Sequence, residues 1–136
     1  MGGDDGPAAT NIIDYFTIPS RGNAYDFGNL SNSTLGGAAC SSSTRGVFSG
    51  GQTPTVLNVI DYVEIMTKGD ATDFGDLINT SRYNHGFSSP TRGFFAGGLN
   101  PTKHPYTEVI TIATKGNSVK FGNCQTGYSK NTFSNS

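Results

Sequence analysis

The chain has 136 residues, with nine Lys and Arg against ten Asp and Glu, and charged residues make up only 14% of it. Charge this sparse and balanced excludes a nucleic-acid binder that relies on a basic surface. Gly alone supplies 19 residues, good helix formers are scarce, and most apolar residues are aromatic or β-branched. These features predict an all-β chain with many turns.

A repeat of 47 residues organises the sequence. The pairs Phe27-Gly28, Phe74-Gly75 and Phe121-Gly122 are each 47 residues apart, with no gap between copies. Residues 11–32 match the second copy at 12 of 22 positions, and residues 44–75 match the third at 14 of 32. Repetition at this period indicates a tandem architecture. We expect a single repeat domain over residues 1–136, with units of approximately 1–43, 44–90 and 91–136.

In chain order, Met1-Gly2-Gly3 corresponds to the end of a second strand, and the first copy then supplies a third and a fourth strand. The second copy supplies a full set. In the third copy, strand candidates lie at 83–88, 94–96, 106–113 and 119–121. One further strand, the first strand of a next unit, is expected in 128–136. The prediction is therefore eleven strands, four to each complete unit, which is the size of a propeller blade.

Tight turns are predicted between the third and fourth strands. The triplets Arg21-Gly22-Asn23, Lys68-Gly69-Asp70 and Lys115-Gly116-Asn117 recur at this place, and Gly next to Asn or Asp supplies positive φ angles. The third strand is apolar on both faces, since Val63 and Ile65 point one way and Ile60 the other. A strand covered on both sides favours stacked sheets.

At this point the sequence resembles the kelch-repeat β-propellers. A double glycine closes the second strand, a Tyr-containing third strand follows, then an aromatic residue and an Arg, and this order is matched by Gly50-Gly51, Asp61-Tyr62, Phe74 and Arg82. Phe replaces the usual Trp in all three copies, Leu35 and Ser129 replace the Arg, and Val109 replaces the Tyr. The resemblance implies four-stranded antiparallel blades in a ring.

Three sequence motifs, Ile-Asp-Tyr (60–62), Lys-Gly-Asp-Ala-Thr-Asp-Phe-Gly-Asp-Leu (68–77) and Ser-Ser-x-Thr-Arg-Gly-x-Phe-x-Gly-Gly (88–98), are also similar to kelch-like arrays of bacteriophage tail fibres and other virion proteins. That resemblance implies a non-enzymatic structural or binding module at a virion or extracellular surface, which presents loops to a host glycan or protein. A self-assembling lectin-like or scaffold propeller is the alternative, and a kelch-type metal oxidase is a weaker one. Neither a cofactor, a metal nor a nucleic acid is expected as a partner.

A propeller needs about four to eight blades to close, and this chain offers fewer than three. We therefore expect the ring to be completed by further copies of the chain or by flanking blades. No stretch approaches the roughly 20 apolar residues of a membrane span, and the first residues lack the features of a signal peptide. Membrane insertion is not expected.

The repeated core is expected to consist of the three Phe residues, the double glycines, a carboxylate in each third strand and two arginines. These are Phe27, Phe74, Phe121, Gly50, Gly51, Gly97, Gly98, Asp14, Asp61, Glu108, Arg45 and Arg92. Each carboxylate is expected to accept hydrogen bonds from backbone N–H groups or from the arginines, because a lone buried charge is costly. Ile18, Ile65 and Ile112 are expected to join the Phe residues in the contact between blades.

Binding is expected in the loops after the double glycine, which differ among otherwise similar copies: residues 4–9, 52–57 and 99–105. Lys103, His104 and Tyr106 are the chosen contact residues, because aromatic and hydrogen-bonding groups suit glycans and polar protein surfaces. Cys40 and Cys124 align with apolar residues in other copies and are expected to be buried hydrophobic side chains.

Overall fold

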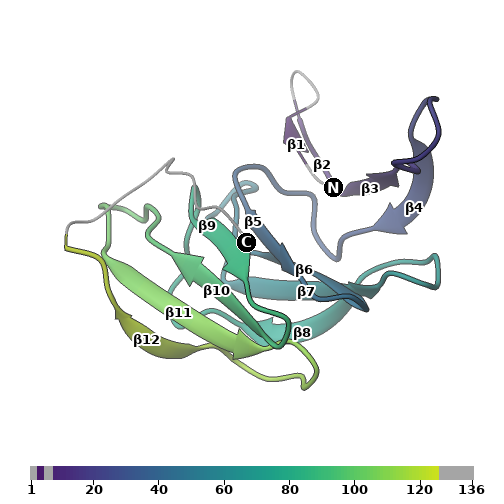
Figure 1. The fold of residues 1–136 in the computed structure, drawn as a ribbon. Coiled ribbons are helices and arrows are strands. Elements are labelled where there is room, and N and C mark those ends of the chain that lie inside the picture. The colour runs from purple at the N-terminus through teal and green to yellow at the C-terminus, as the bar shows by residue number, and fades with distance from the viewer. Residues whose placement is uncertain (1–2, 5–7, 126–136) are drawn as a thin grey trace.

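The computed structural model describes residues 3–4 and 8–125. This part of the chain consists of β-strands joined by turns and loops, and it contains no helix (Figure 1). The prediction of an all-β chain is confirmed.

Two four-stranded antiparallel sheets form most of the described structure. The second sheet contains β5 (Ala38–Ser41), β6 (Arg45–Ser49), β7 (Val59–Glu64) and β8 (Thr72–Asp76), side by side in that order. The third sheet repeats it with β9 (His85–Ser88), β10 (Arg92–Ala96), β11 (Tyr106–Thr111) and β12 (Val119–Asn123). The four strands expected in the third copy agree with β9–β12 to within two residues at each end.

The first sheet is a two-stranded hairpin of β3 (Ile12–Tyr15) and β4 (Tyr25–Asn29), and a second small pair joins β1 (Gly3–Asp4) to β2 (Ala9–Thr10). The strand expected in 128–136 lies outside the described residues. The described sheets follow one another in chain order without forming a closed ring (Figure 1).

The sheets stack face to face through two apolar clusters. Ile13 and Leu30 of the first sheet pack with Val63 of the second, and Val47 and Phe74 of the second pack with Ile110 and other residues of the third. Residues on opposite faces of β7 are both buried, with Ile60 0% and Val63 7% exposed. The prediction of a third strand covered on both faces is therefore confirmed.

The first strands of the second and third sheets approach most closely. The Ser88 hydroxyl donates to the Ser41 carbonyl oxygen across the gap between β5 and β9, at 2.7 Å. A Cβ at Gly86 would lie 1.9 Å from the Ala39 carbonyl oxygen, so this backbone contact requires glycine.

The hairpins between third and fourth strands also need glycine. Gly22, Gly69 and Gly116 have φ angles of 155°, 151° and 152°, which confirms the positive φ expected from the triplets. A β-bulge occurs at the same place in each sheet, immediately before Asp14, Asp61 and Glu108. A bulge changes the direction of the next side chain, and here it directs a carboxylate toward the neighbouring sheet.

The predicted apolar contact is only partly correct. Phe74 is 3% exposed and Ile112 is 1% exposed, as expected, but Phe121 is 60% exposed, Ile18 is 90% exposed and Ile65 is 43% exposed. Phe121 lies in β12, Ile18 lies in the loop between β3 and β4, and Ile65 follows the end of β7. These three side chains lack the cover that Phe74 and Ile112 receive in the cluster between the second and third sheets. Phe27 is half-buried in the cluster between the first two sheets.

Candidate functional site

The carboxylates of the second and third sheets hold the preceding sheet by hydrogen bonds. Asp61 Oδ2 accepts the Ser31 backbone N–H at 3.0 Å and the Ser31 hydroxyl at 2.7 Å. Glu108 Oε2 accepts the Ile78 backbone N–H at 2.8 Å and the Ser118 hydroxyl at 2.5 Å. Both residues are buried. Of the two partners considered for them, the backbone N–H is correct and the arginines are not.

Asp14 occupies the equivalent position in the first sheet, but it is exposed. The difference follows from the stack, because the described strands before the first sheet are the short pair β1–β2 and not a preceding unit like those that supply Ser31 and Ile78. Asp14 is thus an acceptor of the same type as Asp61 and Glu108, without their donors among the described residues.

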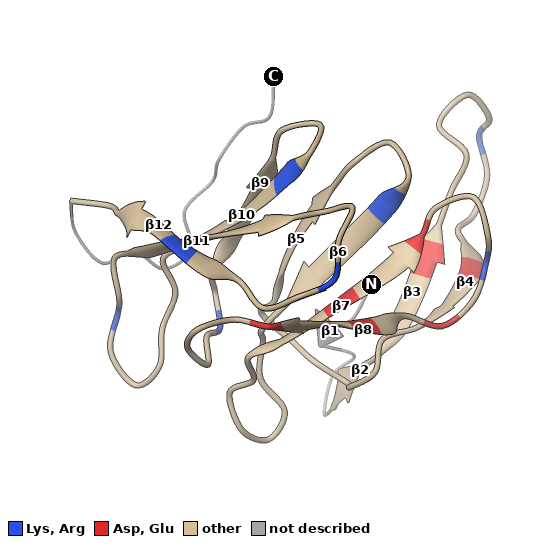
Figure 2. Ribbon diagram, turned by 90° about the horizontal axis from the view of Figure 1, so that it is seen from below, with Lys and Arg blue, Asp and Glu red and all other residues tan. Residues whose placement is uncertain are grey.

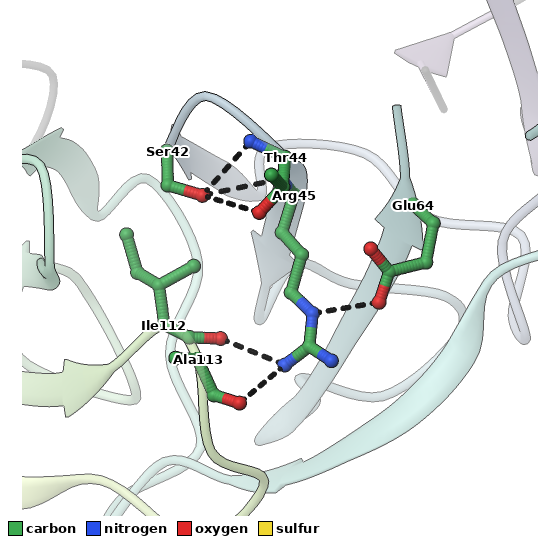
Figure 3. A network of polar contacts seen from close by, with 6 residues as sticks. All are labelled: Ser42, Thr44, Arg45, Glu64, Ile112 and Ala113. Atoms are coloured by element: carbon green, nitrogen blue, oxygen red, sulfur yellow. Dashed lines mark hydrogen bonds and ion pairs between the residues drawn. The ribbon is translucent and has the colours of Figure 1, made fainter. Parts of the chain in front are cut away.

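Arg45 joins the second sheet to the third at the other end of the strands (Figure 3). Its Nε donates to Glu64 Oε1 at 2.8 Å, and its Nη1 donates to the carbonyl oxygens of Ile112 and Ala113 at 3.0 and 2.9 Å. The guanidinium also lies 4.7 Å from the centre of the Tyr62 ring. Arg92, one repeat later, is exposed and lies 5.7 Å from the centre of the Phe94 ring.

The double glycines let consecutive sheets approach at the ends of their second strands. Gly50, Gly51, Gly97 and Gly98 have φ angles of 64°, 98°, 65° and 122°. A Cβ at Gly50 would lie 2.4 Å from the Ser81 carbonyl oxygen, and one at Gly98 would lie 2.0 Å from the Ser81 hydroxyl. Their positions in the repeat therefore require glycine for both backbone conformation and close approach.

Two of the three predicted contact residues lie together after Gly97-Gly98, His104 in the loop and Tyr106 at the start of β11. The rings of His104 and Tyr106 stack with centres 5.4 Å apart, and His104 Nε2 lies 3.2 Å from the Ser81 hydroxyl. Desolvation lowers the pKa of His104 below 6.5, and the nearby charge of Glu108 opposes that change. Lys103 is exposed beside this pair, and no described contact of its side chain joins it to the two rings. Of the first loop, residues 5–7 lie outside the described residues.

The equivalent place between the first and second sheets contains a cavity of about 70 Å³. Its wall includes Thr34, Leu57, Val59 and Asp61, which precede Ser81, His104, Tyr106 and Glu108 by one repeat each. Leu30 and Phe48 contribute apolar surface to the same wall. Equivalent backbone positions thus surround a mainly apolar cavity at the first junction, whereas at the second junction they hold the stacked rings of His104 and Tyr106.

The remaining polar residues are dispersed. Cys40 is buried, as expected, and desolvation raises its pKa to about 12, whereas Cys124 is only half-buried and lies 3.6 Å from the Thr107 hydroxyl. Within residues 3–4 and 8–125, His, Cys, Asp and Glu side chains form no group of three that is able to hold a metal ion. No helix in this part of the chain has the length and apolar character to cross a membrane.

Charge is distributed unevenly along the stack. Asp and Glu gather on β3, β4, β7 and β8 (Figure 2). In the third sheet and its loops, the positive side chains outnumber the one acidic side chain, Glu108; they are Arg92, Lys103, Lys115 and Lys120. The first sheet carries Asp14 and Asp26 with Arg21 in its hairpin. One end of the described structure is therefore basic, while the opposite end is weakly acidic.

No family model matches the chain, and no curated protein matches it either.

Sequence reasoning did not identify the cavity or the role of Ser81. Thr34 and Ser81 occupy the same repeat position, and both have hydroxyl side chains. The alignment of the copies therefore contained a signal for this position. The cavity itself depends on the difference between Leu57 and His104, whose side-chain packing no sequence pattern describes.

Proposed function

We propose that this chain is a non-enzymatic binding module of the β-propeller type, part of a virion fibre or similar appendage, which presents loops to a cell-surface glycan. The tandem four-stranded sheets, the double glycines and the kelch-like order of residues support the architecture. The placement on a virion rests on the resemblance of the repeat to phage fibre arrays.

The observation that carries the proposal is the contrast between two equivalent junctions. The backbone arrangement that is repeated within the chain holds different side chains at the same position. Leu57 lies beside a cavity in one junction, and His104 stacks on Tyr106 in the next. Variation of side chains on a repeated frame is typical of binding surfaces, whereas structural positions such as Gly50 and Gly97 stay constant.

A glycan fits the chemistry of both places. The cavity offers hydroxyl, amide and carboxylate groups among apolar side chains, and its volume of about 70 Å³ admits one substituent of a sugar ring, not a whole drug-sized ligand. The stacked rings of His104 and Tyr106, with Lys103 exposed beside them, offer aromatic surface and hydrogen-bond donors.

The test is binding of the purified chain to an array of bacterial capsular and O-antigen polysaccharides. We expect binding to a subset of glycans, with affinity reduced roughly tenfold by Lys103→Ala or His104→Leu, equivalent to about 1.4 kcal/mol. Thr102→Ala is the matched control, because Thr102 is exposed in the same loop. Absence of binding to every polysaccharide, or equal binding by all variants, would contradict the proposal.

A further inference from the structure

The first and second sheets are joined by a set of four hydrogen bonds between a fourth strand and the following unit. Gly69 N–H donates to the Phe27 carbonyl at 3.0 Å, and Ala71 N–H donates to the Asn29 carbonyl at 2.7 Å. Asn29 N–H donates to Asp70 Oδ1 at 2.9 Å, and the Ser31 N–H bond to Asp61 completes the set.

The same set recurs one repeat later between the second and third sheets. Gly116 N–H donates to the Phe74 carbonyl at 2.8 Å, and Ser118 N–H donates to the Asp76 carbonyl at 2.9 Å. Asp76 N–H donates to Asn117 Oδ1 at 3.0 Å, and the Ile78 N–H bond to Glu108 completes the set. Each donor and acceptor is 47 residues beyond its counterpart, so the junction is a repeated unit of structure.

The groups for a third set of these hydrogen bonds are present in the chain. The acceptor side lies on the third sheet and the donor side on the first sheet, at opposite ends of the described structure. Continuing the register by 47 residues gives Phe121, Asn123 and Gln125 on the third sheet. Stepping back by 47 residues gives the matching half on the first sheet, in which Gly22, Asn23, Ala24 and Asp14 replace Gly69, Asp70, Ala71 and Asp61. Among the described residues, these groups have no junction partner of this kind.

The faces that carry the two halves are apolar and exposed. On the third sheet, Val119 is 61% exposed and Phe121 is 60% exposed, and Phe121 packs edge-on against Phe94 with ring centres 5.1 Å apart. Next to the first sheet, in the loop that follows β3, Phe16 is 68% exposed and Ile18 is 90% exposed. At the junction that is formed, the counterparts of Phe121, Phe16 and Ile18 are buried: Phe74 is 3% exposed, Ile110 4% and Ile112 1%.

The distribution of charge and the contacts of Arg45 also fit a pairing of the third sheet with the first. The basic end of the structure carries Phe121, and the weakly acidic end carries Asp14. Arg92 corresponds to Arg45, whose carbonyl acceptors on Ile112 and Ala113 correspond to Ile18 and Pro19. One contact is not repeated: Lys68 and Lys115 lie over the rings of Tyr15 and Tyr62, whereas Val109 occupies the next such position.

We propose that the third sheet of one copy binds the first sheet of a second copy, head to tail, and reproduces the junction between the second and third sheets. Phe121 and Arg92 of one copy then contact Ile18 and its neighbours in the next, and Asp14 accepts the N–H of Gln125. The two surfaces differ, so the interface is heterologous and either closes into a ring or continues into a longer array. This pairing is independent of the ligand that the loops bind.

Gly122 provides the sharpest test of this pairing. At the formed junctions, a Cβ on its counterparts Gly28 and Gly75 would lie 2.2 and 2.5 Å from a carbonyl oxygen of the next hairpin. A Cβ on Gly122 meets no atom within 4 Å. Gly122→Ala therefore leaves the single copy intact and blocks the interface, whereas Gly75→Ala, the matched variant, lowers the stability of the single copy.

Ala24 provides the complementary variant on the other surface. Ala24 is exposed, whereas its counterparts Ala71 and Ser118 are at least partly buried in formed junctions. Ala24→Arg therefore places a charged side chain in the interface without disturbing the single copy, and it adds positive charge opposite the basic third sheet.

The experiment is sedimentation velocity with native mass spectrometry on the full chain from micromolar concentration upward. We expect the wild type to associate, Gly122→Ala and Ala24→Arg to remain monomeric with the melting temperature of the dilute, unassociated wild type, and their equimolar mixture to form a one-to-one dimer. The dimer follows because each variant retains one intact surface. A monomeric wild type, unimpaired association of either variant, or a mixture that stays monomeric would overturn the proposal.

Discussion

Phe74 is the residue whose truncation tests the stacked core most clearly. Its side chain is 3% exposed, lies in the cluster shared by the second and third sheets, and contacts the Tyr62 ring edge-on with centres 5.9 Å apart. Phe74→Ala removes a fully packed ring, which costs roughly 3–5 kcal/mol of unfolding free energy when the cavity does not collapse. Phe121→Ala is the matched control, since the same repeat position is 60% exposed, and its expected cost is about 1 kcal/mol or less.

Thermal unfolding followed by circular dichroism in dilute protein, below the concentration at which copies associate, measures both variants. For a domain of this length, 1 kcal/mol shifts Tm by roughly 3–5 °C, so Phe74→Ala is expected to lower Tm by roughly 10–20 °C. Phe121→Ala is expected to change it by a few degrees. Equal shifts for the two variants would refute the reasoning, because the burial difference between successive copies would then have no energetic consequence.

Arg45→Gln is expected to lower the unfolding free energy by about 1–3 kcal/mol, because it leaves two carbonyl oxygens without their charged donor; Glu64→Gln, which loses only a partly exposed ion pair, should cost less than about 1 kcal/mol in the same urea titration. Burial lowers the pKa of His104, so the unfolded chain binds more protons than the folded one as pH falls below 6.5, and stability is expected to decrease there. His104→Leu should reduce this slope in denaturant titrations at successive pH values, and the rest of the slope should remain because burial also lowers the pKa of the other histidine; a slope unchanged by the substitution contradicts this assignment. Because burial raises the pKa of the Cys40 thiol to about 12, a thiol reagent at neutral pH should modify Cys40 only after unfolding and Cys124 before it, as peptide mass mapping would reveal.

The sequence predicted the strands because each copy independently repeats the same local signals. Double glycines, Gly-Asn or Gly-Asp turns and β-branched third strands depend on backbone geometry within a few residues, so β9–β12 were located to within two residues. The burial of Phe74 and the apolar character of both faces of β7 followed from the same pattern.

Burial at the ends of the stack was not predictable from the repeat alone. Phe27, Phe74 and Phe121 occupy the same repeat position and are each followed by Gly, yet their exposure depends on whether a neighbouring sheet covers them. The same reason explains why Ile18 is exposed and Ile112 is buried.

Of the candidate site, sequence reasoning chose His104 and Tyr106 as contact residues, but it predicted neither their ring stacking nor the surrounding geometry. Loop variation after the double glycine directed attention to the segment in which the His104 ring stacks on that of Tyr106. The contact with Ser81 and the cavity near Leu57 depend on side chains from the preceding unit. Neither feature has a local sequence signature.

Amide hydrogen exchange measured by NMR tests the repeated junction most directly. The account predicts that Gly116 and Ser118, which donate to β8, exchange slowly in dilute protein, while Gly22 and Ala24 exchange rapidly and become protected as concentration rises. If Gly116 and Ser118 exchange as fast as Gly22 and Ala24 under dilute conditions, the sheets are not joined by the junction described, and the central claim is contradicted.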